Sequence, residues 1–203
     1  AEAVLFRLCC ADTMNQHQVV SLTDEGKHGS LLRAKGVPVE CIHMPRGRLT
    51  ISGLINLWRI LRKLRPDVVQ TWMYHADLIG GLVAIFAGVR TICWNIRNSN
   101  LDKDRSKRTT IWVRQICAYL SSWIPNLIVC CAQMAEQTHV ELGYDAGKFV
   151  VIPNGYDFSA FKPDYVQRER LRMEWGIAHD IPLIGMVGRF HAQKDHANLI
   201  TAL

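Results

Sequence analysis

Short apolar runs alternate along the chain with longer segments in which apolar residues recur every three or four positions. The runs predict strands over residues 18–23, 39–44, 67–72, 90–96, 127–131 and 149–152. The longer segments predict helices over residues 1–11, 29–34, 52–65, 76–88, 109–122 and 133–142. Most runs are apolar at consecutive positions, which is typical of strands buried on both faces. The alternation therefore predicts an α/β protein with a parallel sheet that has helices on both faces.

The pattern changes after residue 163. Residues 164–180 are rich in charge and include a helical stretch, and the apolar run over 182–189 then predicts a new strand. We therefore expect three parts: a first domain over 1–163, a connector over 164–181 and the beginning of a second α/β domain over 182–203. Both ends of the sequence have helical periodicity without a start or stop signal, so we expect a segment of a longer polypeptide.

Composition narrows the class of protein. With 203 residues, 49% of them hydrophobic, the chain has enough apolar material for a sizeable core, and long polar low-complexity stretches are absent. The most apolar stretch, residues 78–89, is shorter than the roughly 20 residues that a membrane-spanning helix needs. The seven cysteines form no C-x-x-C pair and no set with zinc-ligand spacing. We expect reduced, buried thiols in a cytoplasmic protein and no metal site.

Positive charge is concentrated in two spans. The net charge is +6, from 24 basic and 18 acidic residues. Residues 46–65 contain six basic residues and no acidic one, and residues 97–114 contain six basic residues against Asp102 and Asp104. Such spans are most often a solvated helix face. Localised positive charge can also attract anionic lipid, nucleic acid or a phosphorylated substrate. No aromatic interleaving accompanies the charge, so nucleic acid is not the expected partner.

The predicted helix over 52–65 carries part of this charge. Ser52 is the expected N-cap, and Pro66 ends the helix. Arg59, Arg62 and Lys63 share one outer face because residues three and four apart are neighbours on a helix. The apolar residues expected to face inward are Ile55, Leu57, Trp58, Leu61 and Leu64.

Ligands of parallel sheets bind beyond the carboxyl ends of the strands. This rule selects the loops that follow the central strands, at residues 73–77, 97–100, 132–133 and 153–157. The polar candidates in these loops are His75, Arg97, Asn98, Asn154 and Gly155. His75 serves equally well as an ordinary loop histidine, and Asn154-Gly155 also suits a turn that needs a permissive backbone.

Several motifs occur in a fixed order along the chain. They are Pro66-Asp67-Val68-Val69-Gln70-Thr71, Val151-Ile152-Pro153-Asn154-Gly155-Tyr156-Asp157, Phe161-Lys162-Pro163, and Gly185-Met186-Val187-Gly188-Arg189-Phe190 with Lys194 and Leu199-Ile200. Each is weak alone, but the ordered set resembles the family-4 retaining glycosyltransferases. The resemblance extends over essentially the whole chain, since Ala1-Glu2 is similar to the end of a family loop.

The resemblance implies the GT-B fold, in which two Rossmann-like domains face each other across a cleft. Residues 1–163 are then an acceptor domain without its first strand, and residues 182–203 begin the donor domain. Arg189 and Lys194 match the family's donor-phosphate pair, and cationic side chains at such positions stabilise a departing diphosphate. The family uses such residues in place of a divalent metal, so no metal or other cofactor is expected.

The loop after the strand over 90–96 departs from the family pattern. Many members place a histidine there, and Asn98 occupies the equivalent position in this chain. An amide can hydrogen-bond a sugar hydroxyl but cannot titrate. Either Asn98 contacts the sugar without moving a proton, or the correspondence is displaced by one residue. The catalytic residue is left unassigned, while Arg97, Asn98, His75, Asn154 and Gly155 are expected to line the acceptor cleft.

The resemblance implies a hexosyl transfer from a nucleotide-sugar to a glycan or lipid-linked acceptor, with retention, in polysaccharide or glycolipid assembly. Without most of the donor domain, the chain alone is expected to be inactive. Arg59, Arg62, Lys63 and Arg65 are candidates for binding an anionic membrane, which implies a protein at its cytoplasmic face. The alternatives are a GT-B-fold sugar-nucleotide epimerase and a basic nucleic-acid-binding module.

Overall fold

The computed structural model describes residues 2–98, 107–156, 158, 162–188, 190 and 194–203. The chain divides into two compact units, Ala1–Gly155 and Tyr156–Leu203, which we call the N-terminal and C-terminal units. The predicted domain limits at residues 163 and 181 stay predictions. Within the described residues, no helix is both long and apolar enough to cross a membrane.

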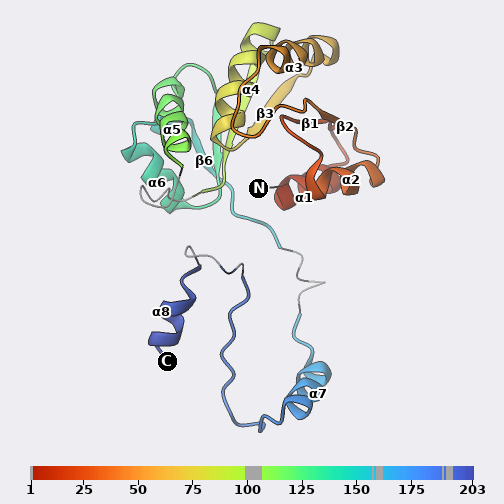
Figure 1. Cartoon of the computed structure of the whole chain (residues 1–203), viewed down its shortest axis with the longest axis vertical. Coiled ribbons are helices and arrows are strands. Elements are labelled where there is room, and N and C mark those ends of the chain that lie inside the picture. Colours follow the sequence, from red (N-terminus) through yellow and green to blue (C-terminus); the bar gives the residue numbers. More distant parts are fainter. Residues whose placement is uncertain (1, 99–106, 157, 159–161, 189, 191–193) are drawn as a thin grey trace. The chain divides into compact units, whose positions relative to one another are not determined.

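Strands and helices alternate through the N-terminal unit (Figure 1). Its helices are α1 (Glu2–Ala11), α2 (Gly26–Ala34), α3 (Ile51–Leu64), α4 (Tyr74–Ala87), α5 (Arg108–Leu120), α6 (Gln133–Glu141) and the short 3-10 helix η1 (Ala146–Lys148). Its strands are β1 (Val19–Ser21), β2 (Val39–Cys41), β3 (Val68–Trp72), β4 (Thr91–Ile96), β5 (Leu127–Cys130) and β6 (Phe149–Val151). The C-terminal unit contains α7 (Tyr165–Trp175) and α8 (His196–Thr201).

All the strand pairs are parallel, which confirms the predicted α/β class. The strands form two sheets, however, where one was expected: β1 pairs with β2, and β3-β4-β5-β6 pair in sequence order. Within the described residues, no hydrogen-bond ladder joins the two sheets. Both sheets nevertheless contribute to one core, because Ile42 and Met44 after β2 are buried in the same cluster as Trp94 and Ile96 of β4.

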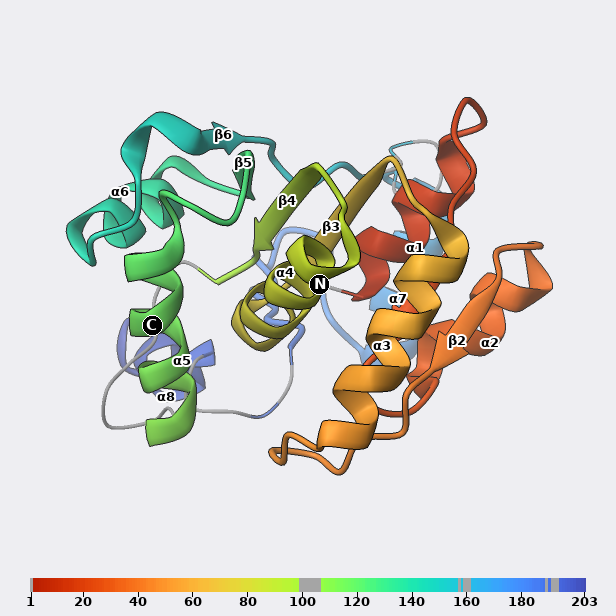
Figure 2. The same cartoon turned by 90° about the horizontal axis from the view of Figure 1, so that it is seen from above.

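Helices α3, α4 and α5 lie side by side in that order (Figure 2). The central helix, α4, packs closely on β3 and β4 through small residues. A Cβ at Gly80 would lie 2.9 Å from Cγ2 of Thr71, and a Cβ at Gly81 would lie 2.8 Å from Cγ2 of Ile124. The small residues of α4 therefore allow the helix to pack closely on the sheet and on the segment after α5.

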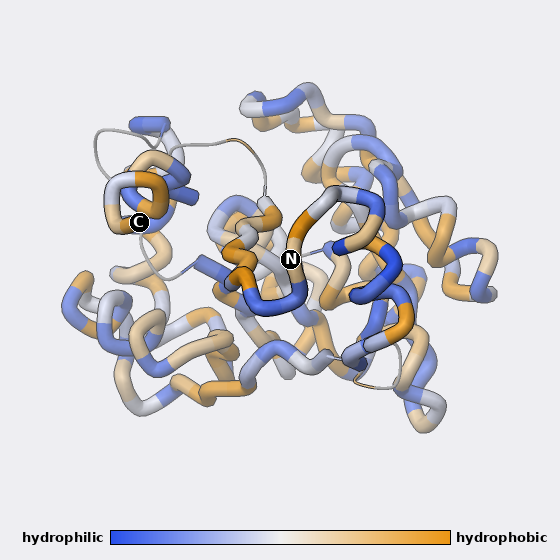
Figure 3. Tube along the Cα trace, turned by 90° about the horizontal axis from the view of Figure 1, so that it is seen from below, coloured by the Kyte–Doolittle hydropathy of each residue, from blue (hydrophilic) through white to orange (hydrophobic). Residues whose placement is uncertain are grey.

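Helix α3 differs from its prediction in two respects. Its N-cap is Thr50, whose Oγ1 accepts a hydrogen bond from the Gly53 amide at 3.2 Å, and Ser52 lies inside the first turn. Leu57 and Leu61 are buried as expected, but Ile55 and Trp58 are exposed. Gly53 is buried as well, and a Cβ built on it would meet the side chain of Met44. Apolar and polar residues alternate along the helices in Figure 3.

The C-terminal unit has no strand among its described residues. The strand predicted from residue 182 is not formed in this chain, and residues 182–188 are all exposed. A strand needs a neighbour for its backbone groups, and the described residues provide none at this position. Arg172 of α7 holds the segment between this helix and residue 182. Its guanidinium donates to the carbonyl oxygens of Ala178 at 2.6 Å and Ile181 at 2.9 Å.

Candidate active site

The carboxyl ends of β3, β4, β5 and β6 lie along one edge of the four-stranded sheet. Trp72 is registered with Asn95, Ile96 with Cys130, and Cys130 with Val151. The loops that follow these strands therefore all start from the same edge. This arrangement is the one in which parallel sheets place their ligands.

Arg97 is the centre of a polar cluster at this edge, which we call the Arg97 cluster and define as Trp72, Asn95, Arg97 and Asn154. The Arg97 side chain donates from Nε to Oδ1 of Asn95 at 2.6 Å and from Nη1 to Oδ1 of Asn154 at 3.0 Å. Its Cζ lies 5.1 Å from the ring centroid of Trp72, within the range of a cation–π contact. Three segments, from the ends of β3 and β4 and from beyond β6, thus meet on one guanidinium.

The local sequence explains why these side chains meet. Asn95 and Arg97 are two residues apart in an extended segment, so their side chains leave the backbone on the same side. The register places Trp72 next to Asn95 on the adjacent strand. The Ile152 amide donates to the Cys130 carbonyl at 2.8 Å, which keeps the chain beyond β6 beside the sheet and delivers Asn154 to Arg97.

Two of the predicted cleft residues, Arg97 and Asn154, are therefore in direct contact. Asn98 follows Arg97 and is half-buried. His75 is exposed in the first turn of α4, and its side chain makes no hydrogen bond in the part of the chain that the structure describes. Desolvation by neighbouring atoms lowers the pKa of His75 from its ordinary value, which favours the neutral imidazole.

Gly155 is exposed, and a Cβ built on it would meet nothing within 4 Å. Its φ is not in the left-handed region either. Neither its backbone conformation nor its surroundings in the structure require a glycine, so its predicted role in the cleft stays a prediction.

A buried carboxyl group supports the turn between β3 and α4. Asp77 is fully buried; its Oδ1 accepts from the Thr71 hydroxyl at 2.6 Å, while its Oδ2 has no partner among the described residues. Its amide donates to the carbonyl of Met73 at 2.9 Å, and Met73 itself has a φ of 74°, a conformation that L-residues rarely adopt. Burial raises the pKa of Asp77 to about 7.

A second buried contact joins α4 to α6. His139 donates from Nδ1 to the Ala135 carbonyl at 2.6 Å, and its Nε2 therefore accepts from the Tyr74 hydroxyl at 2.8 Å. Burial lowers the pKa of His139, which keeps its ring neutral. This pair is enclosed in the core, so it supports the elements behind the cluster and does not face a ligand.

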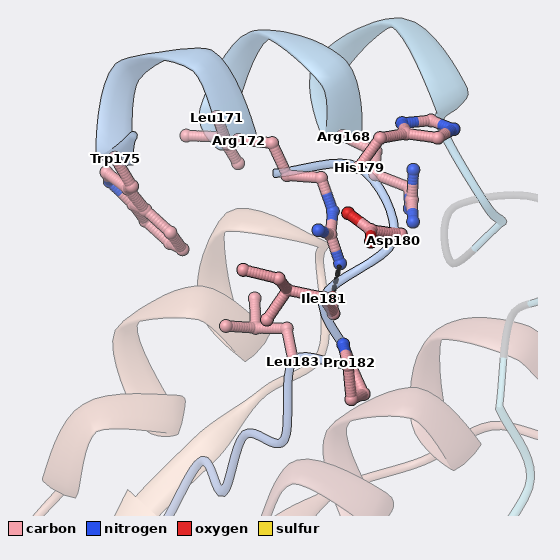
Figure 4. A pocket seen from close by; sticks show the side chains of 9 residues that line it. All are labelled: Arg168, Leu171, Arg172, Trp175, His179, Asp180, Ile181, Pro182 and Leu183. Atoms are coloured by element: carbon pink, nitrogen blue, oxygen red, sulfur yellow. Dashed lines mark hydrogen bonds between the residues drawn. The ribbon is translucent and has the colours of Figure 1, made fainter. Parts of the chain in front are cut away.

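The predicted donor-phosphate pair belongs to the C-terminal unit. Arg189 lies outside the described residues, and Lys194 is exposed. The same unit contains a hollow of about 670 Å³ between α7 and the segment after it (Figure 4). Its lining includes the apolar side chains of Leu171, Trp175 and Leu183 and the guanidinium of Arg172, and it includes none of the predicted site residues.

Sequence reasoning missed Trp72 and Asn95. Asn95 carried a signal, because a polar residue in an otherwise apolar strand and two positions before an arginine must point to the same side as that arginine. Trp72 carried none, since its role depends on the register between β3 and β4. Among the described residues, no three His, Cys, Asp or Glu side chains are grouped closely enough to hold a metal ion.

Comparison with known proteins identifies the family. The model of Glycosyltransferase Family 4 matches residues 1–160. The chain belongs to this family. It is 25% identical to the UDP-Gal:alpha-D-GlcNAc-diphosphoundecaprenol alpha-1,3-galactosyltransferase of Escherichia coli, over 81% of this family-4 chain and 42% of that protein. The chain thus spans less than half the length of this curated relative.

Solved structures show the same fold. The crystal structure of Anabaena HepE in complex with UDP superposes with a TM-score of 0.80 at 21% identity, over 99% of this chain and 53% of that one. A UDP-N-acetylglucosamine 2-epimerase from Rickettsia bellii superposes with a TM-score of 0.51 at 13% identity, over 87% and 49% of the two chains. The fold alone therefore does not separate a transferase from an epimerase.

Proposed function

We propose that the full-length family-4 protein transfers a hexose from a nucleotide-sugar to a glycan or lipid-linked acceptor, with retention of the anomeric configuration. The observation that carries the proposal is the Arg97 cluster, in which side chains at the carboxyl ends of the parallel strands converge on one cation in a chain of this family. The Escherichia coli relative is named for a transfer from UDP-galactose to a diphosphate-linked lipid. We extend that class of donor and acceptor to this protein.

In this proposal the N-terminal unit holds the acceptor. Arg97, Asn98, Asn154 and His75 offer the hydrogen-bonding groups that a sugar or phosphate requires. Arg189 and Lys194 of the C-terminal unit bind the donor diphosphate and stabilise the charge that develops as it leaves. No metal or other cofactor takes part.

The test is a transfer assay with the full-length protein. UDP- and GDP-sugars are supplied with undecaprenyl-diphosphate-linked N-acetylglucosamine, and nucleotide release and product mass are measured. Transfer of a hexose, with the anomeric configuration of the donor found in the product by NMR, is expected. Epimerisation of a UDP-sugar without acceptor, or salt-dependent DNA binding without any response to nucleotide-sugars, would replace the proposal with one of its alternatives. We expect the 203-residue chain alone to show no turnover.

We further propose that the protein binds the cytoplasmic face of a membrane through α3. Arg59, Arg62, Lys63 and Arg65 are exposed at this helix and its C-cap. The exposed ring of Trp58 lies under the Arg62 guanidinium, with 6.0 Å between Cζ and the centroid, and its Nε1 donates to the Phe86 carbonyl of α4 at 3.2 Å. Exposed apolar side chains next to cations are the combination that a peripheral helix uses on anionic lipid.

Flotation with acidic liposomes tests this attachment. At low salt the wild type is expected to float, and R59E/R62E is expected to stay in the soluble fraction. The variant K162E/R170E makes the same change in charge at exposed positions of the C-terminal unit and is expected to float. A second exposed aromatic face on α5, formed by Trp112 and Tyr119, is the competing surface. Loss of flotation in W112S/Y119S, with R59E/R62E unchanged, would assign the contact to α5.

A further inference from the structure

The guanidinium of Arg97 has unused binding capacity at the edge of the sheet. Of its five N–H groups, one is used on Asn95 and one on Asn154, so three have no protein acceptor among the described residues. It forms no salt bridge with a carboxylate of the described chain. Its positive charge is therefore not neutralised by these residues and can attract an anion.

The surroundings hold this cation in one orientation. Trp72 lies against the guanidinium, Asn95 holds Nε from within the sheet, and Asn154 holds Nη1 from the segment beyond β6. Asn95 is 1% exposed, and its Nδ2 has no partner among the described residues. A buried amide donor without a partner lowers the free energy of unfolding. The orientation that points the Asn95 oxygen at Arg97 therefore costs the protein some stability.

We infer that the Arg97 cluster is a diphosphate-binding site, in which the remaining N–H groups of Arg97 bind the oxyanions of a substrate diphosphate. This inference rests on the proposed function, because it names the substrate group that the N-terminal unit recognises. A planar guanidinium presents paired donors that match two phosphate oxygens, and its fixed orientation reduces the entropy lost on binding.

Isothermal titration of the 203-residue chain with inorganic pyrophosphate tests the site. The dissociation constant is expected to rise at least about tenfold in R97Q, since two charge-assisted hydrogen bonds are lost, and by a smaller factor in R97K, which keeps the charge but not the paired donors. R90Q is the matched control, because Arg90 is exposed just before the opposite end of the same strand. R90Q is expected to leave the affinity unchanged. K194Q measures any separate pyrophosphate binding at the predicted donor-phosphate pair.

Several results would overturn the inference. They are an absence of pyrophosphate binding, an equal loss in R90Q and R97Q, and a loss that follows Lys194 instead of Arg97. Circular dichroism and thermal melting of each variant establish that it is folded. If R97Q alone unfolds, the test uses R97K and N154A as two separate variants. An unchanged pyrophosphate affinity in both, with both folded, contradicts the site.

Two further titrations identify where the diphosphate comes from. UDP represents the donor, and farnesyl diphosphate represents a lipid-linked acceptor. An Arg97-dependent affinity for either ligand supports the site and identifies its source, whereas dependence in neither contradicts it. Pyrophosphate binding through Arg97 without sugar transfer by the full-length protein would refute the proposed function and leave the site standing. Sugar transfer by the full-length protein without Arg97-dependent binding would support the proposed function and refute the site.

Discussion

Two apolar runs of similar composition take different structures in this chain. Leu127-Ile128-Val129-Cys130 forms β5, and its last three residues are buried. Leu183-Ile184-Gly185-Met186-Val187 forms no strand, and all of its residues are exposed. Both runs have the residue types that strands favour, so intrinsic preference does not explain the difference.

The neighbouring strands explain why only one of the two apolar runs forms a strand. Strand β5 pairs with β4 on one side and β6 on the other, so both of its edges have a hydrogen-bonding partner. Residues 182–188 pair with no strand of the described chain. An apolar run becomes a strand only where other strands accept its backbone groups and other side chains cover its faces.

The largest test of this comparison is a matched pair of truncations. Ile128 is fully buried in β5, so I128A is expected to lower the free energy of unfolding by about 3 kcal/mol, through lost burial and the cavity left behind. Ile184 is 59% exposed, and I184A is expected to change it by less than about 0.5 kcal/mol. Urea unfolding at neutral pH measures both. Equal losses would mean that the second run is packed in solution.

A second pair of substitutions adds a methyl group to a glycine, whereas the first pair removes side-chain atoms. A Cβ at Gly81 would lie 2.9 Å from Nε1 of the buried Trp94, so G81A is expected to destabilise the protein by about 1–2 kcal/mol despite alanine's better helix propensity. Gly185 has open space around it, and G185A is expected to change stability by a few tenths of a kcal/mol at most. Thermal melts give both values. A stable G81A would show that α4 does not pack closely on the sheet.

A third test concerns pH. The folded-state pKa of Asp77, about 7, lies above its ordinary value of 3.8, so the folded state holds the proton more tightly. The stabilisation is complete below pH 3.8 and is lost as the pH rises through 7. The stability difference between wild type and D77N is therefore expected to shift against the wild type by about 2 kcal/mol between pH 5 and 7.

Urea unfolding at several pH values measures this shift. D180N provides the control, because Asp180 is exposed in the C-terminal unit and the same substitution there removes a carboxyl group that is not buried. A D77N difference that stays constant with pH would show that the Asp77 carboxyl is ionised in the folded protein. Burial would then determine how side chains pack in this chain without changing the ionisation of Asp77.

The sequence predicted the elements of the N-terminal unit well because their periodicity is strong. The strand over 67–72 and the helix over 76–88 were found within a few residues, and Gly88 ends that helix in the left-handed conformation that favours glycine. The orientation of α3 was predicted less well, since Ile55 and Trp58 look like core residues in any helical projection. Their exposure depends on which face the neighbouring elements cover.

The candidate site, too, was predicted only in part from the sequence. The sequence indicated Arg97 and Asn154 because both follow predicted strands, and this reasoning needs only the rule that parallel strands end at one edge. It could not pair them, because their contact joins residues 57 positions apart through the register of three strands.

Local chemistry along the chain determined that this is a parallel α/β protein with polar groups after its strands, because periodicity and turn residues act over a few positions. Only the tertiary structure decided that Trp72, Asn95 and Asn154 surround one arginine and that two similar apolar runs take different structures. Both outcomes depend on which distant segment lies alongside, and hydrogen bonds and burial between segments cannot be seen from either segment alone.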